Sequence, residues 1–400
     1  MDYGRCYTEM KQITFVIPTR NNLEFLELAY HSIRNLSGNH EILILDDAST
    51  DDTSKWLENL KDDKLIIHTN PGPERIGIVG MFDKGIELAT TKIICAFHAD
   101  MVAGNNFDIN ILKHLRKGIV VSGTRIEPPL HPPGPEKIIH DFGSEVKTFE
   151  MSKWIENNTS FENEKVTDGI FAPWCMYRED FLSIGGHDKL FAPQSREDSD
   201  LFNRFKLNGY EIIQSWDALV YHFTSRGSRY NKLSGGDTGK DSPEWKATNS
   251  KNVRNFIRKW GTEVLHNSTL NPIVAPIYNI GFVVHNCNIE HLHMLEPWCS
   301  NIFIDNEFVV LDYIDREQQN TLIDLSNKCY GGESYKKKCK NDIIVEFDLK
   351  QLTQQDGDMI AKFPWIFNDS GETGKFKLGN FNIEILKLQE NQNDNIFIKE

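Results

Sequence analysis

Four short apolar runs alternate with amphipathic segments over the first hundred residues, and this alternation limits the folds that the chain can adopt. The apolar runs are each followed by polar residues, and they span residues 13–17, 41–45, 65–68 and 93–97. The segments between them place apolar side chains at the three- and four-residue spacing of helices that lie on a sheet, and they span residues 23–36, 56–60 and 78–89. This alternation of strand and helix predicts a doubly wound, mostly parallel α/β sheet.

Polar side chains follow three of the predicted strands. Thr19 and Arg20 follow the first, Asp47 the second and Asp100 the fourth. Ligands of open parallel sheets bind outside the carboxyl ends of the strands, so we expect these residues to meet at one edge, together with Arg75 from a Pro/Gly-rich loop. Asp100 can bind a divalent metal, and Arg75 can neutralise phosphate. For each of these residues taken singly, a structural role in a turn, as a helix cap or as an exposed side chain is as good an explanation as a functional one. The clustering of all of them at one edge is what favours a functional site.

The composition restricts the function. The chain has 58 Asp or Glu and 44 Lys or Arg, and the formal net charge of −14 argues against a nucleic-acid partner. An acidic protein that handles phosphates requires a metal ion. The seven cysteines form no CxxC pair, which is typical of a reducing compartment. Residues 1–12 lack the apolar core of a signal peptide and no window approaches the roughly 18 apolar residues of a membrane span, so we expect a cytoplasmic protein, whose oligomeric state the sequence does not specify.

Further candidates lie later in the chain. Asp198 begins a predicted helix, where backbone N–H groups keep its carboxylate charged as either a base or a cap. His222 follows a predicted strand and is a metal ligand if it lies beside Asp100, or otherwise a packed core residue. Trp174 can line a ligand pocket, although an aromatic residue is more often part of the core. A proline-rich stretch, 127–135, predicts an extended loop that borders an acceptor groove.

The length of 400 residues predicts two domains rather than one. The composition shifts near residue 265. We therefore predict a catalytic domain over residues 11–265 and a smaller C-terminal domain over residues 266–400. The C-terminal domain contains several histidines and cysteines, but their spacing matches no tetrahedral zinc site.

The C-terminal domain reads as a partial repeat of the first. Residues 279–292 resemble a faded copy of residues 13–26, and residues 307–313 resemble residues 41–47 at nearly the same spacing. Alternating residues toward the end of the chain predict strands, and hence a β-rich tail. In this domain no predicted strand ends in a metal-binding motif. The domain is therefore predicted to bind a ligand or to act as a scaffold, and not to catalyse a reaction.

Four motifs, taken in order along the chain, carry a resemblance to a known family. They are Val-Ile-Pro-Thr-Arg-Asn at 16–21, Leu-Asp-Asp-Ala-Ser-Thr-Asp-Asp-Thr at 45–53, Phe-His-Ala-Asp at 97–100, and Gly-Gly-His-Asp at 185–188 followed by Glu-Asp at 197–198. Each is weak alone, but together they resemble the inverting glycosyltransferases of family 2, which have the GT-A fold. One position departs from that family, because His98 stands where its metal motif usually begins with Asp. The chain also lacks the Gln-x-x-Arg-Trp motif of processive synthases, which implies a single-addition enzyme.

The resemblance implies a role for each matching residue. Asp198 would be the general base, while Asp100 and His222 would bind Mn²⁺ or Mg²⁺ at the donor diphosphate. The nucleotide-sugar would be bound by Pro18, Thr19, Arg20, Asp47, Arg75, His98, Ala99, Trp174, Gly186 and Glu197. The ribose contact expected at position 98 would change or be lost, because His replaces Asp. The implied architecture is a GT-A catalytic domain, with a Rossmann-like, doubly wound sheet, followed by a smaller degenerate GT-A-like α/β unit with a β-rich tail.

One function is favoured over three alternatives. We predict a metal-dependent inverting transferase that moves a single hexosyl or N-acetylhexosaminyl group from a nucleotide-diphosphate sugar, with a UDP-sugar expected, to a hydroxyl of a glycan or other glycoconjugate. An inactive scaffold that binds nucleotide-sugars or carbohydrates stays open, supported by His98 and the faded repeat. A sugar nucleotidyltransferase would require a Gly-rich, basic loop after the first strand, and residues 18–22 are not of that kind. A glycoside hydrolase would require two carboxylates at the scissile bond and no nucleotide site.

Overall fold

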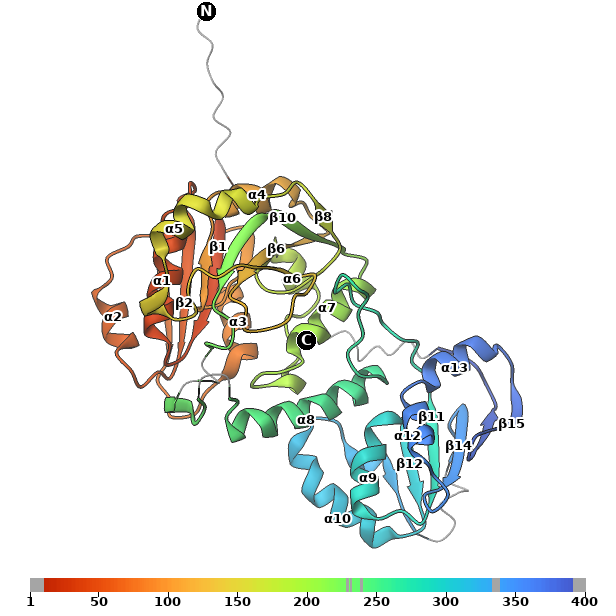
Figure 1. The fold of residues 1–400 in the computed structure, drawn as a ribbon. Coiled ribbons are helices and arrows are strands. Elements are labelled where there is room, and N and C mark those ends of the chain that lie inside the picture. Colours follow the sequence, from red (N-terminus) through yellow and green to blue (C-terminus); the bar gives the residue numbers. More distant parts are fainter. Residues whose placement is uncertain (1–10, 228–229, 231, 238–239, 333–338, 391–400) are drawn as a thin grey trace, which may run out of the picture. The chain divides into compact units, whose positions relative to one another are not determined.

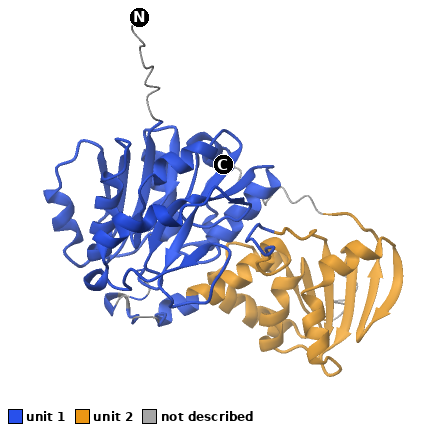
Figure 2. Ribbon diagram, turned by 45° about the horizontal axis from the view of Figure 1, so that its top comes forward, with its two compact units in different colours: residues 1–247, 266–272, 400 blue, residues 248–265, 273–399 orange. Residues whose placement is uncertain are grey.

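The computed structural model describes residues 11–227, 230, 232–237, 240–332 and 339–390. The chain forms two compact units, drawn in different colours in Figure 2. Of the described chain, residues 11–247 and 266–272 make up the N-terminal unit, and residues 248–265 and 273–390 make up the C-terminal unit. The division falls inside helix α8 (Pro243–Trp260), ahead of the predicted boundary at residue 265, and the short segment after that boundary returns to the N-terminal unit.

The N-terminal unit is built on one mixed sheet with the order β3-β2-β1-β4-β9-β6-β10-β5, to which β7 adds beside β6 and β8 beside β10 (Figure 1). Its strands are β1 Ile13–Thr19, β2 Glu41–Asp47, β3 Leu65–Asn70, β4 Ile93–Ala96, β5 Met101–Ala103, β6 Ile119–Glu127, β7 Lys137–Ile139, β8 Val166–Thr167, β9 Trp174–Tyr177 and β10 Glu211–His222. Its helices before α8 are α1 Leu23–Arg34, α2 Thr53–Asn59, α3 Gly77–Leu88, α4 Phe107–His114, α5 Met151–Asn157, α6 Arg178–Ser183 and α7 Glu197–Leu207.

The first four strands are parallel neighbours, which confirms the predicted doubly wound start. β2 and β3 follow on one side of β1, whereas β4 lies on the other side of β1. Because crossovers between parallel strands are right-handed, this reversal places α3 on the opposite face of the sheet from α1 and α2. The side chains of β1 and β2 are almost all buried, as expected for strands covered on both faces. Ligands of such sheets bind where the strand order reverses, here at the carboxyl ends of β1 and β4.

Strand β6 extends further than the sequence predicted. Glu127, predicted to begin the proline-rich loop, is instead the last residue of β6. Its ladder continues because β7 pairs with it on one side, with Glu127 opposite Ile139, and β10 pairs with it up to Ile126. β7 lies across the proline-rich loop and β10 lies more than 80 residues further along the chain, so the pattern within β6 itself does not mark the extension. The loop therefore begins at Pro128.

The C-terminal unit is built on a second sheet with the order β13-β12-β11-β14-β16-β15. Its strands are β11 Ile280–His285, β12 Asn301–Ile304, β13 Cys329–Tyr330, β14 Ile343–Asp348, β15 Gly374–Leu378 and β16 Phe381–Ile385. Its helices after α8 are α9 Ile289–Leu295, α10 Glu307–Glu317, α12 Gln354–Ile360 and α13 Phe363–Ser370. The predicted β-rich tail thus extends this sheet, with β16 and β15 antiparallel to their neighbours. Across both units, no described helix combines the length and the apolar character needed to cross a bilayer.

The predicted repeat is wrong in one of its two matches. Residues 307–313, matched to strand β2, form the first two turns of helix α10. The side chain of Asn306 accepts hydrogen bonds from the backbone N–H groups of Phe308 and Val309, which starts a helix there. Phe308 is 84% exposed while Val310 is buried, so the apolar residues follow helical packing rather than a buried strand. The strand that follows β11 and α9 is β12, which pairs parallel to β11 as β2 pairs to β1.

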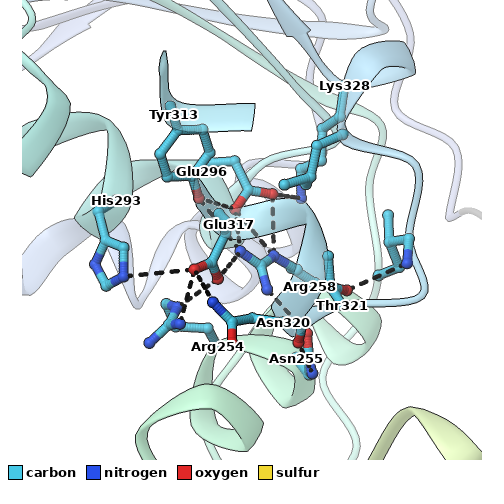
Figure 3. A network of polar contacts seen from close by, with 12 residues as sticks. Arg254, Asn255, Arg258, His293, Glu296, Tyr313, Glu317, Asn320, Thr321 and Lys328 are labelled. Atoms are coloured by element: carbon cyan, nitrogen blue, oxygen red, sulfur yellow. Dashed lines mark hydrogen bonds and ion pairs between the residues drawn. The ribbon is translucent and has the colours of Figure 1, made fainter. Parts of the chain in front are cut away.

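A buried network of charged side chains holds the C-terminal unit together (Figure 3). Arg258, from α8, is fully buried and lies 2.7 Å from Glu296 and 2.8 Å from Glu317. Lys328 lies 2.8 Å from the other oxygen of Glu296, and the Tyr313 hydroxyl donates to the same carboxylate at 2.8 Å. Burial alone would raise the pKa of Glu296, but Lys328 and Arg258 lower it to about 2. The carboxylate therefore stays charged inside the unit.

Replacing Arg258 with Met is expected to lower the free energy of unfolding by roughly 3–5 kcal/mol, because two buried carboxylates lose a shared partner. The pKa of Glu296 is lower in the folded state than in the unfolded state, so its contribution is present above about pH 4.5 and is lost as the pH falls toward 2. Denaturant unfolding at pH 7 and at pH 3 measures both effects. Arg316→Met is the control, since its pair with Asp312 is exposed and should contribute about 0.5 kcal/mol. An equal decrease in the free energy of unfolding in the two variants would show that the buried network does not stabilise the unit more than an exposed ion pair does.

Candidate active site

A cavity of about 600 Å³ lies in the N-terminal unit where the strand order reverses. The predicted site residues that line it are Pro18, Thr19, Arg20, Asp47, Arg75, His98, Ala99, Asp100, Glu197, Asp198 and His222. They come from the ends of β1, β2 and β10, from the turns after β4 and before α3, and from the start of α7. The fold thus brings together residues about 200 positions apart in the sequence, and the proline-rich loop adds His131 to the same lining. Their individual roles stay predictions.

Two predicted binding residues are not part of this lining. Trp174 is 1% exposed on β9, where its ring stacks on Phe181 in the core. Gly186 has a φ of +71°, and a Cβ atom there would lie 2.8 Å from the carboxylate of Asp83. That carboxylate accepts the backbone N–H of His187, so the glycine serves a tight turn. The structure gives both residues a packing role, which is the more common one for a tryptophan of this kind.

Three side chains converge on one point of the cavity as a candidate metal site. One ligand atom from each of His98, Asp100 and His222 lies within 4.8 Å of the others. The antiparallel pairing of β10 with β5 places His222 opposite Met101, and the N–H of Phe223 donates to the Asp100 carbonyl at 3.1 Å. His222 Nε2 consequently lies 3.7 Å from Asp100 Oδ2. Within the described ranges, this trio is the one such group of three His, Cys, Asp or Glu ligands, and the histidines and cysteines of the C-terminal unit form none.

The trio has the chemistry that a divalent metal requires. Burial lowers the pKa of His98 despite the nearby Asp100 and Asp198, so its imidazole is neutral and its lone pair is available. Two imidazole nitrogens and one carboxylate oxygen bind divalent first-row metals in many proteins. The residues present therefore fit the metal-dependent chemistry implied by the sequence, with His98 as an additional candidate ligand. The sequence pattern had suggested only Asp100 and His222.

Glu127 is a functional candidate that the sequence did not reveal. The parallel pairing of β6 with β10 sets Ile126 opposite Tyr221, so Glu127 lies beside His222. The Nδ1–H of His222 donates to Glu127 Oε1 at 2.7 Å, which leaves the Nε2 lone pair directed toward the trio. Burial alone would raise the pKa of Glu127, but the hydrogen bond from His222 and the charges nearby lower it to about 2. The sequence would have indicated Glu127 only if the predicted strand had been extended to this residue.

Replacing Glu127 with Gln is expected to weaken Mn²⁺ binding roughly 10- to 100-fold, because a neutral partner orients and polarises His222 less well. Titration of the full chain with Mn²⁺, followed by the electron paramagnetic resonance signal of the free ion, measures the dissociation constant. Glu136→Gln is the matched control, since Glu136 pairs with Lys137 but not with His222. Equal affinities in all three proteins would show that Glu127 does not support the metal site.

Basic and hydroxyl groups at the cavity have hydrogen-bonding capacity left over. The buried atoms Thr19 Oγ1, Arg20 Nε and Arg75 Nε make no hydrogen bond to any described residue. Arg75 is held by Gln194 at 3.2 Å and by an ion pair of 3.5 Å with Glu244, an exposed partner. Burial and the charge of Arg20 lower the pKa of Arg75. Two guanidinium groups this close repel each other, which a bound anion such as a diphosphate would relieve.

Asp47 lines the cavity, but its carboxylate has an evident structural task. Its oxygens accept hydrogen bonds from the side chain of Asn70 at 2.8 Å and from the backbone N–H groups of Ile76 at 2.8 Å and Gly77 at 2.7 Å. The helix-capping alternative is therefore realised, at the start of α3. By the same contacts Asp47 fixes the loop that carries Arg75. A carboxylate has about four acceptor positions, so one remains for a ligand.

Two adjacent carboxylates at the start of α7 differ in their surroundings. Glu197 is 7% exposed, and its Oε2 has no hydrogen-bond partner within the described part of the chain. Burial and the charge of Asp198 raise the pKa of Glu197 to about 8, so this carboxyl is mostly protonated at pH 7. Asp198, at the second position of the helix, is only half-buried and lines the cavity. The pair offers one base and one hydrogen-bond donor.

Residues 14–182 match the family described as glycosyl transferase family 2. Among solved structures, the chain is similar to GalNAc-T7 with UDP, GalNAc and Mn²⁺ (13% identity, TM-score 0.45, covering 63% of this chain and 49% of that chain). It is also similar to the mannosyltransferase PcManGT from Pyrobaculum calidifontis in complex with GDP-Man and Mn²⁺ (18% identity, TM-score 0.42, covering 63% and 64%). The chain thus spans from half to just under two thirds of the length of these proteins. No curated protein matches it significantly.

The family match covers β1 to α6 and includes the motifs at the ends of β1, β2 and β4. It ends before Asp198 and His222, which the fold brings to the same cavity. The sheet order, with its reversal beside β1, is that of a doubly wound α/β domain. Residues 14–182 of the N-terminal unit are therefore similar to glycosyl transferase family 2.

Proposed function

We propose that the chain is a metal-dependent, inverting glycosyltransferase that moves one sugar from a nucleotide-diphosphate sugar to a hydroxyl acceptor. One observation carries the proposal. A single cavity is lined by a metal-ligand trio, by two arginines with unused donors and by the accessible carboxylate of Asp198. The arginines and the metal site can neutralise the charge of the nucleoside diphosphate as it leaves. The carboxylate of Asp198 can take the proton of the acceptor hydroxyl.

The cationic side of the cavity suits the diphosphate of the donor. Arg20 and Arg75 present N–H groups that make no hydrogen bond to described residues, and these groups can donate to phosphate oxygens. Asp47 and Gln194 hold the Arg75 loop and side chain in place. His98, Asp100 and His222 would hold the divalent metal, which when bound offsets the charge of the leaving diphosphate. Glu127 would keep His222 in the tautomer that leaves Nε2 free.

Asp198 supplies the base for the acceptor. Its carboxylate lies at the N-terminus of α7, where the helix dipole favours the charged form. It can accept the proton of an acceptor hydroxyl as that hydroxyl attacks the sugar C1. Glu197 beside it is mostly protonated at pH 7 and so is a donor rather than a second base. One base without a separate nucleophile supports direct displacement, and hence inversion.

The finer assignments carry over from the sequence expectations: a UDP-sugar with a hexosyl or N-acetylhexosaminyl group as the donor, a glycan or other glycoconjugate as the acceptor, and a cytoplasmic location. The C-terminal unit is assigned binding or scaffolding on the sequence expectation that it lacks a metal-binding motif.

A panel of UDP- and GDP-sugars, each with and without Mn²⁺, tests the proposal. Thermal shift reports binding, and release of free nucleotide reports transfer or hydrolysis. We expect at least one nucleotide-sugar to raise the melting temperature only when Mn²⁺ is present, and the wild type to release nucleotide from that donor. Binding without any nucleotide release, across a range of acceptors, would favour an inactive scaffold. Absence of binding with every metal would overturn the proposal.

A further inference from the structure

We infer that His98 is a third metal ligand, and that the resulting set of two imidazoles and one carboxylate selects transition-metal ions such as Mn²⁺ and Co²⁺ over Mg²⁺. The inference rests on the proposed function, since it concerns the metal site of the same cavity. It goes further in deriving a metal class from the histidine at position 98, where the family motif usually has Asp.

The geometry brings His98 into the trio rather than toward a ribose alone. Its ring nitrogen belongs to the set of ligand atoms that lie within 4.8 Å of one another. The ring centroids of His98 and His222 lie 6.4 Å apart in an edge-to-face arrangement, and the ring of Phe82 lies 6.3 Å from that of His98. The positions of the other two ligands are fixed by the backbone, because the Asp100 carbonyl accepts the N–H of Phe223. His98 therefore packs against an aromatic ring and lies close to the other two ligands.

The donor set determines which ions bind well. Mg²⁺ favours oxygen ligands in a near-ideal octahedron and gives up its water reluctantly. Imidazole nitrogen suits transition metals, and the affinity of a nitrogen-containing site rises from Mn²⁺ to Co²⁺. An Asp at position 98 would have given an oxygen-rich site with one imidazole, open to Mg²⁺. With His98 the nitrogen ligands outnumber the oxygen ligands, so the expected order of affinity is Co²⁺, then Mn²⁺, then Mg²⁺.

Metal binding by the full chain, without any sugar donor, tests the inference. Free Mn²⁺ is followed by electron paramagnetic resonance, Co²⁺ by its visible absorption, and Mg²⁺ by its ability to displace Mn²⁺. In the wild type we expect the dissociation constant for Mn²⁺ to be lower than that for Mg²⁺ by about tenfold or more. A factor of this size is typical of the affinity change when one favourable interaction at a metal site is gained or lost. His98→Ala should weaken Mn²⁺ by a similar factor, with a smaller change for Mg²⁺. His98→Asp should bring the two affinities together and change the Co²⁺ spectrum.

His131→Asn is the matched control, because His131 is an imidazole in the lining of the same cavity but outside the trio. It should keep the wild-type ratio of Mn²⁺ to Mg²⁺ affinity. Equal affinity of the wild type for Mn²⁺ and Mg²⁺, or an unchanged ratio in both His98 variants, would overturn the inference. Nucleotide release supported equally by Mg²⁺ would also overturn it while leaving the proposed function standing. A metal preference that holds although no nucleotide-sugar binds would support the inference while the proposed function fails.

Discussion

Asp198→Asn is expected to lower kcat for sugar transfer roughly 100- to 10,000-fold, the range found for loss of a general base. The substitution keeps the shape of the side chain and its place at the start of α7, but an amide cannot accept the proton of the acceptor hydroxyl. Donor affinity should change little, because the arginines and the metal trio remain. Nucleotide release at saturating donor and acceptor measures kcat, and thermal shift with the donor alone measures binding. A kcat within threefold of the wild type would remove Asp198 from the mechanism.

Glu197→Gln is the sharpest control for Asp198, because it changes the neighbouring carboxylate. Glu197 is mostly protonated at pH 7, so an amide that also donates a hydrogen bond should cost less than about tenfold in kcat. Its pKa of about 8 lies above the unfolded value of roughly 4.3, so the wild type loses stability as the pH rises between these values. The Gln variant has no such loss, and its melting temperature relative to the wild type should rise from pH 5 to pH 8. If Glu197→Gln were the inactive variant and Asp198→Asn the active one, the two roles would be exchanged.

Asp100→Asn is expected to reduce transfer about 1,000-fold, since a loss of several kcal/mol of metal-dependent stabilisation corresponds to that factor. Asp100 supplies the only anionic ligand of the trio, and it is already buried between His98 and His222. The backbone carbonyl that pairs with Phe223 is unaffected, so the fold should persist. Mn²⁺ titration and nucleotide release measure binding and activity separately. The variant should bind Mn²⁺ weakly and release little nucleotide at any Mn²⁺ concentration.

Asp52→Asn is the control for this experiment, because Asp52 is an exposed carboxylate in the motif that follows β2. It should leave both measurements within twofold of the wild type. Full activity of Asp100→Asn in the presence of a chelator would show that transfer does not depend on the metal. Loss of activity with unchanged Mn²⁺ affinity would place Asp100 on the substrate rather than on the metal.

Much of the fold could be read from local patterns. The runs at 13–17 and 41–45 became β1 and β2, and the apolar spacing of residues 23–36 became α1, because side-chain periodicity is a local property. Residues 307–313 show the limit of this reading. Their apolar residues suit a strand or a helix, and the cap provided by Asn306 decided for the helix.

The candidate site was predictable to the extent that strand ends were predictable. Asp100 and His222 were expected to meet, and the pairing of β10 with β5 places them together. The roles of Glu127 and His98 were not expected. Glu127 depends on the ladder that β6 forms with β7 and with the distant β10, and the position of His98 beside Asp100 and His222 depends on the pairing of β10 with β5. For Trp174 the sequence left a pocket position and a core position open, and the structure places it in the core.

The sequence by itself determined which residues can do chemistry and that the polar ends of parallel strands would gather at one edge. Strand direction and helix position follow from periodicity, which acts over a few residues. Only the tertiary structure decided which of those residues touch. The register between β6, β10 and β5 sets Glu127 on His222 and His222 beside Asp100, and burial at α7 raises the pKa of Glu197. Register and burial depend on contacts between distant segments, and for that reason no local pattern in the sequence specifies them.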